Sequence, residues 1–124
     1  MREILFRGKF GNEWKYGFLS IEPKGLVIKE LYKNENSNVW HIDADTVGQY
    51  TGFKDKDGAK IFEGDICSFC NTDGGLTNYE VLWFGGKWVV REASSNVVDD
   101  LDLFFCERSV AIGNIYDSPE LLKE

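Results

Sequence analysis

Apolar and polar positions alternate in short runs along the whole chain, and turn-forming residues separate these runs. A period of two is typical of half-buried β-strands. The runs at residues 3–10, 14–21, 26–32 and 39–42 predict four strands of an antiparallel N-terminal lobe that spans residues 1–46. The turns between them are predicted at Gly11-Asn12, at Pro23-Lys24-Gly25 and at residues 34–38.

A central hairpin is predicted around a charged turn at residues 55–58, which stands between two apolar runs. One register makes Asp57-Gly58 the loop and places Phe53 opposite Phe62. The other register forms a type I turn over residues 55–58 with Gly58 left-handed, and this slips the pairing by one residue. The spacing leaves both registers open.

Residues 79–92 predict a second hairpin, with Gly85-Gly86 as its two-residue turn. The pairs in this register are Trp83 with Trp88, Val81 with Val90, Leu82 with Val89, and Glu80 with Arg91. One face of the ribbon is then wholly apolar. On the other face, Leu82, Phe84 and Val89 would form an exposed apolar patch unless something covered them. We therefore predict that these three residues contact a protein partner or a second copy of the chain.

The C-terminal part has a less regular pattern. Residues 103–106 fit either a strand or a covered turn, and residues 110–116 predict a last strand. Ser118, Pro119 and Glu120 then supply an N-cap, a proline in the first turn and an acid near the helix start, so a short terminal helical turn is expected.

Three segments, in order along the chain, resemble the YopX-like family of phage and prophage proteins. They are Arg2-Glu-Ile-Leu-Phe-Arg7 with Trp14-Lys-Tyr-Gly17, the central Gly48-Gln-Tyr-Thr-Gly52 with Ile61-Phe-Glu-Gly-Asp-Ile66, and the closing Ile112-Gly-Asn-Ile-Tyr-Asp-Ser-Pro-Glu-Leu-Leu122. The resemblance implies a small β-rich fold with an SH3-like barrel portion and no established activity. We accordingly expect a mainly β protein, with the barrel and its short C-terminal helical turn over residues 47–124.

Composition narrows the choice of function. A chain of 124 residues with 43% apolar and 15% aromatic content is large and apolar enough for one core, or for two small lobes that share one. The net charge of −7 argues against a protein that binds nucleic acid by neutralising phosphates. Under the alternative that a small barrel stacks exposed bases, Lys54, Lys56 and Lys60 are the local basic cluster that would contact nucleic acid.

The three cysteines raise the question of a metal or redox site. Cys67 and Cys70 have the spacing of a zinc knuckle, and Cys106 with His41 could nominally complete four ligands. Residues three apart on a strand point to opposite faces, however, so packing of reduced thiols is favoured and no metal or cofactor is expected. The chain also starts without an apolar leader and has no long apolar run, so we expect a cytoplasmic protein.

Carboxylates could support acid–base chemistry or bind calcium. Glu63 and Asp65 would share a strand face, but a bend in which the aspartate bonds backbone amides is favoured. A calcium loop centred on residues 55–58 fails, because its first and twelfth positions are Phe53 and Gly64.

The chain also lacks a nucleophile elbow and a phosphate-binding glycine loop, and His41 is its only histidine. We therefore predict a non-catalytic protein.

Overall fold

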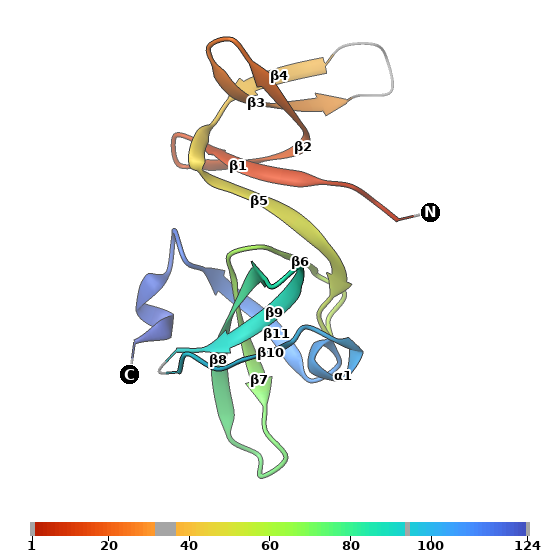
Figure 1. The fold of residues 1–124 in the computed structure, drawn as a ribbon, viewed down its shortest axis with the longest axis vertical. Helices are drawn as coiled ribbons and strands as arrows, with labels where there is room; N and C mark the ends of the chain where they lie inside the picture. The colour runs from red at the N-terminus through yellow and green to blue at the C-terminus, as the bar shows by residue number, and fades with distance from the viewer. Residues whose placement is uncertain (1, 32–36, 94, 124) are drawn as a thin grey trace. The chain divides into compact units, whose positions relative to one another are not determined.

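The structure is a computed structural model that describes residues 2–31, 37–93 and 95–123, and it is mainly β, as predicted (Figure 1). The chain divides after Tyr50 into an N-terminal unit and a C-terminal unit. The division falls within one strand, β5 (Asp43–Lys54), and the boundary predicted after residue 46 falls within the same strand.

The N-terminal unit is a single antiparallel sheet. Its other strands are β1 (Phe6–Phe10), β2 (Glu13–Glu22), β3 (Gly25–Leu31) and β4 (Ser37–His41). The order is β4-β3-β2-β1-β5, so β4 and β5 stand at opposite ends of this series although only Ile42 separates them in the chain. Because one residue spans less than 4 Å, the sheet has to curl until these two strands approach. Of the turn predicted at residues 34–38, residues 34–36 lie outside the described part and the other two belong to β4.

The N-terminal unit is packed by a close approach of the Gly8 backbone to Ile42 and by cationic side chains over tryptophan rings. Val27, Ile28 and Ile42 are buried. Gly8 is needed beside them, because a Cβ there would run into the Cδ1 of Ile42. Next to Gly8 on β1, Arg7 places its guanidinium 4.5 Å from the ring centre of Trp14 on β2.

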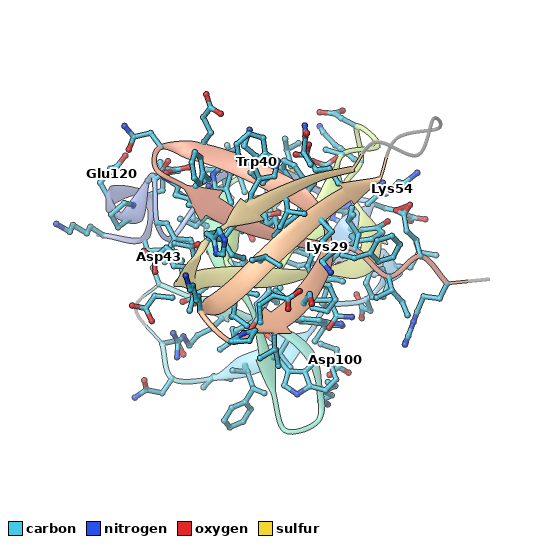
Figure 2. The ribbon with its side chains drawn as sticks, turned by 90° about the horizontal axis from the view of Figure 1, so that it is seen from above. Lys29, Trp40, Asp43, Lys54, Asp100 and Glu120 are labelled. Carbon is cyan, nitrogen blue, oxygen red and sulfur yellow. The ribbon has the colours of Figure 1, made fainter. Side chains whose placement is uncertain are left out.

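The second tryptophan of this unit is packed in a similar way. The Nζ of Lys15 lies 3.9 Å from the ring centre of Trp40, which Figure 2 labels, and Phe10 packs against the same ring at 5.0 Å. Cations over tryptophan faces are favourable contacts. The unit therefore combines a small aliphatic core with cation–aromatic layers.

The C-terminal unit contains a second antiparallel sheet, of five strands, and a short strand that joins the end of β5. Its elements are β6 (Lys60–Phe62), β7 (Asp65–Cys70), β8 (Leu76–Phe84), β9 (Lys87–Glu92), β10 (Val98–Asp100), α1 (Leu103–Cys106), β11 (Ser109–Asn114) and the 3₁₀ helix η1 (Pro119–Leu122). The end of β5 pairs with β6, and the main sheet has the order β10-β9-β8-β7-β11. The last strand thus returns beside the first, after a helical turn, which is the SH3-like arrangement that the resemblance implied. The N-terminal unit has the same strand order, which the sequence did not reveal.

The core of the C-terminal unit lies on one face of this sheet. Its buried members are Ile61, Cys67, Val81, Val90, Leu101, Phe105 and Cys106. Residues 103–106 form a helix because the Asp102 side chain accepts a hydrogen bond from the Phe105 amide at 2.9 Å. The short terminal helical turn is confirmed as η1, although the Ser118 side chain makes no capping bond.

The central turn follows the second of the two predicted registers. The Gly58 amide donates to the Asp55 carbonyl at 3.0 Å, the Asp55 amide donates to the Ala59 carbonyl at 2.8 Å, and Gly58 has a φ of +86°. The Asp55 carboxylate is buried and accepts three further backbone bonds at 2.9 Å, from Asp57, Ala59 and Ala111. One side chain therefore ties this turn to β11.

Candidate functional site

The β8–β9 hairpin has the predicted register. Trp83 pairs with Trp88, Val81 with Val90, Leu82 with Val89, and Glu80 with Arg91. Gly85 and Gly86 form the turn with φ values of +65° and +81°, which residues other than glycine rarely adopt. The ladder between β7 and β8 runs only from Leu76 to Glu80 on β8, so the end of the ribbon extends beyond the part that β7 pairs.

Large apolar side chains lie exposed at this end of the ribbon. Trp83 is 53% exposed and Phe84 is 59% exposed, while Leu82 is half-buried. The Trp83 ring meets the Trp88 ring edge-on, with 4.9 Å between their centres. We name Leu82, Trp83 and Phe84 the hairpin patch; by the strand alternation Trp83 lies on one face of the ribbon tip, and Leu82 and Phe84 lie on the other. The prediction missed Trp83 because the alternation placed it on the inner face, and only its position beyond β7 leaves it exposed.

Val89, the third residue predicted for the apolar patch, has to be removed from it. Its side chain is 0% exposed. Val89 lies on a central strand, with Leu82 on one side and Asp100 on the other. A covered central position does not present a side chain to a partner, so Val89 supports the sheet.

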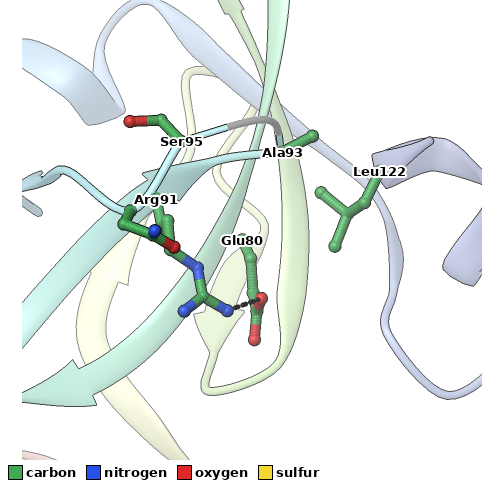
Figure 3. A pocket seen from close by; sticks show the side chains of 6 residues that line it. Glu80, Arg91, Ala93, Ser95 and Leu122 are labelled. Atoms are coloured by element: carbon green, nitrogen blue, oxygen red, sulfur yellow. Dashed lines mark hydrogen bonds and ion pairs between the residues drawn. The ribbon is translucent and has the colours of Figure 1, made fainter. Parts of the chain in front are cut away.

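A cavity of about 430 Å³ lies on the outer side of the hairpin (Figure 3). Its lining residues are Glu80, Arg91, Ala93, Ser95, Asn96 and Leu122. An Arg91 Nη2–Glu80 Oε1 ion pair of 2.9 Å joins the two charged members. The two charges of the lining are therefore already paired with each other.

A second cavity, of about 380 Å³, opens beside α1. Its lining residues are Phe69, Tyr79, Val90, Asp99, Asp100, Asp102, Phe104 and Phe105. We name it the aromatic cavity. The sequence contained a signal for it, since a run of aspartates leads directly into Leu103-Phe-Phe, but strand patterns could not show that β7 and β8 supply the facing rings.

The lysines of the nucleic-acid alternative stand at the central turn. Lys54, Lys56 and Lys60 are all exposed, and Figure 2 labels the first of them. An exposed acid, Asp57, lies within the same turn. Binding of nucleic acid at this turn stays a prediction, and Asp57 would oppose it by placing a negative charge among the three lysines.

The three cysteines form no disulfide, and two of them are buried. Cys67 and Cys106 are buried, and Cys70 is half-buried. Burial raises the pKa of the Cys67 thiol far above its ordinary value, and burial together with the Asp102 carboxylate raises the pKa of Cys106 to about 11. Both thiols therefore stay protonated near neutral pH. Among the described residues, no group of three or more His, Cys, Asp and Glu side chains could hold a metal ion.

The Glu63-Gly64-Asp65 segment forms the predicted bend. The buried Asp65 Oδ2 accepts a hydrogen bond from the Phe62 amide at 2.7 Å, and Gly64 has a φ of +91°. The carboxylate thus holds the turn between β6 and β7.

His41 is exposed at the end of β4, in the N-terminal unit. No helix in the described part of the chain is both long and apolar enough to cross a membrane.

These features define a small antiparallel β protein of two units with an exposed aromatic ribbon. The family model described as "YopX protein" matches residues 7–123, and the chain belongs to this family. A crystal structure of protein EF1440 from Enterococcus faecalis is similar, with a TM-score of 0.56, 23% identity, and coverage of 99% of this chain and 100% of that one. This likeness supports the fold alone. No curated protein matches the chain.

Proposed function

We propose that this protein is a non-catalytic interaction module that binds another protein, or a second copy of itself, through the hairpin patch. The observation that supports this is the exposure of more than half of both Trp83 and Phe84 at the end of one ribbon. Burying such a side chain at an interface stabilises a complex by roughly 2 kcal/mol. Tryptophan and phenylalanine are also enriched at the centres of protein interfaces.

The ribbon presents these side chains in a fixed geometry. Its two-residue glycine turn sets the register, and the edge-on contact with Trp88 holds the Trp83 ring. A patch that is ordered before binding loses less conformational entropy when a partner arrives. This makes the hairpin patch a better candidate interface than single exposed apolar residues elsewhere.

Self-association is tested by light scattering over a wide range of protein concentration. If a second copy occupies the patch, the mean mass rises with concentration for the wild type and stays at the monomer value for Phe84→Ser. Phe18→Ser is the matched control, because Phe18 is 50% exposed on β2 of the other unit. Each copy carries a net charge of −7, so added salt should favour self-association by screening the repulsion.

Binding of a different protein is tested with a photo-reactive phenylalanine analogue at position 84, in cells that naturally express the protein. The expected result is one dominant crosslinked product at position 84 that Trp83→Ala abolishes, with no such product from position 18. A strict monomer whose crosslink from position 84 is unaffected by Trp83→Ala would remove the support for this function.

We extend the same proposal to the setting of the protein, a phage or prophage product acting in the host cytoplasm. The family resemblance supports the phage origin, and the reduced thiols suit a reducing compartment. Detection of the protein in the cytoplasmic fraction after phage induction is the expected result.

A further inference from the structure

The aromatic cavity has a floor of packed rings. Phe69 and Phe105 stack at 5.1 Å with an angle of 10° between their planes, and Tyr79 meets Phe105 edge-on at 5.4 Å. Phe104 leans against Phe69 at 6.1 Å and is 60% exposed. The rings come from β7, β8 and α1, so the sheet and the helix together hold the floor in place.

The rim of the aromatic cavity carries three exposed aspartates. The Asp100 carboxylate pairs with Lys87 at 2.7 Å, and Asp102 uses one oxygen to cap α1. No described residue forms an ion pair with Asp99. The charge of Asp99 nevertheless acts on the floor of the cavity. Burial raises the pKa of Tyr79, and the negative charges of Glu92 and Asp99 raise this pKa further. Among the described residues, Lys87 pairs with one of the three rim carboxylates, so the rim keeps negative charge.

The same rings already accept a cation from within the chain. The Arg108 guanidinium lies 5.8 Å from the ring centre of Phe69 and 5.6 Å from that of Phe104. It is anchored by hydrogen bonds to the carbonyls of Cys70 and Asn71, and it does not line the cavity. Arg108 therefore shows that a guanidinium can pack against these rings, at a place outside the cavity lining.

We propose that the aromatic cavity binds an arginine side chain from a basic segment of a partner protein. A planar guanidinium can stack on an aromatic ring and still donate hydrogen bonds to a carboxylate, and the exposed Phe104 ring and Asp99 offer these two contacts. Charge complementarity selects the occupant, because a second copy of this acidic chain would bring like charge to the rim. This site shares no residue with the hairpin patch, so it stands or fails independently of the proposed function.

The test is an NMR titration of the full chain with acetyl-Gly-Arg-Gly amide. Its matched control is the same peptide with citrulline, which has nearly the same shape and no charge. We expect saturable shifts of the amide signals of residues 99–105 with the arginine peptide. The citrulline peptide should bind about tenfold more weakly, because it loses both the ion pair and the cation–π contact.

Two variants locate the contacts. Asp99→Asn and Phe104→Ala should each weaken arginine-peptide binding about twofold to fivefold without unfolding the chain, since both side chains are exposed. Asp45→Asn removes the same charge from the other unit and should leave binding unchanged. Equal binding of the two peptides, shifts centred elsewhere, no binding, or equal weakening by Asp45→Asn would overturn the proposal.

Discussion

In the N-terminal unit, Ile42 alone carries the chain from its fourth strand to its fifth, whereas residues 101–108 with the helix α1 make the corresponding connection in the C-terminal unit. Both units have the same strand order, in which the last strand returns beside the first. The shorter connection brings little apolar surface. The longer one adds Leu101, Phe105 and Cys106 to a core and forms one wall of the aromatic cavity.

The two units are consequently stabilised in different ways. Among the described residues, four buried apolar side chains belong to the N-terminal unit and ten to the C-terminal unit. The N-terminal unit supplements its small core with Arg7 and Lys15 against tryptophan rings. The C-terminal unit instead relies on its larger apolar core and on the hydrogen bonds of the Asp55 carboxylate. One strand order is therefore compatible with two kinds of interior, and in this protein both candidate binding surfaces belong to the unit with the larger core.

The largest effect is expected from Asp55→Ala. The change removes the buried acceptor of three backbone amides, so the free energy of unfolding of the C-terminal unit should fall by about 3 kcal/mol. Urea unfolding, followed through the NMR amide signals of each unit, measures this. The control Asp57→Asn changes an exposed acid of the same turn and should stay within about 0.5 kcal/mol of the wild type. A loss of unfolding free energy in the N-terminal unit only would contradict the placement of Asp55 as a support of the C-terminal unit.

Thiol labelling reports on the C-terminal core alone, because all three cysteines lie in that unit. With a pKa of about 11 against an ordinary value of 9.0, Cys106 should react with iodoacetamide about 100-fold more slowly at pH 8 than an unperturbed thiol. Cys67 should react more slowly still, and the half-buried Cys70 should react first. Mass spectrometry of the labelled peptides measures the three rates, and equal rates would show that this core opens readily.

The same shift predicts a pH dependence of stability. Because the folded-state pKa of Cys106 is raised, its contribution to stability is fully present below pH 9 and is lost as the pH rises through about 11. The urea midpoint of the C-terminal unit should therefore fall across this window. Cys106→Ala, which has no titrating group, should show a smaller fall.

A smaller effect is expected from Gly8→Ala in the N-terminal unit. The new Cβ would meet the Cδ1 of Ile42, so we expect a loss of about 2 kcal/mol in that unit alone. Ile42→Val removes this methyl group. The double variant should therefore lose about 1 kcal/mol less than the sum of the two single losses, as measured by urea unfolding. Additive losses would mean that the close approach of Gly8 to Ile42 does not limit the packing.

The smallest effects concern two ion pairs near the hairpin. Arg91→Met breaks the pair with Glu80, whose side chain is 16% exposed, and should cost about 1 kcal/mol. Lys87→Met breaks a pair whose two side chains are more than 60% exposed, and should change the free energy of unfolding by less than about 0.3 kcal/mol. Thermal unfolding of both variants at low and high salt measures the difference, and a larger loss for Lys87→Met would reverse our ranking.

The local features could be predicted from the sequence alone. The β8–β9 register follows from a two-glycine turn and strict alternation, and the bend at Asp65 follows from its glycine and short acid. Such features are decided within about a dozen residues, where turn geometry and side-chain period act directly. The central turn was narrowed to two registers, and only the hydrogen bonds of Asp55 distinguish them.

Only the tertiary structure decided which side chains are covered. The alternation places Val89 on the predicted exposed face and Trp83 on the predicted inner face, yet Val89 is buried and Trp83 is exposed beyond the end of β7 pairing. The pairing of β11 with β7 and of β5 with β1 joins residues about 40 positions apart, and no local pattern encodes it. Burial depends on which distant strand lies alongside. The aromatic cavity and the extent of the hairpin patch therefore emerge only when the sheets have formed.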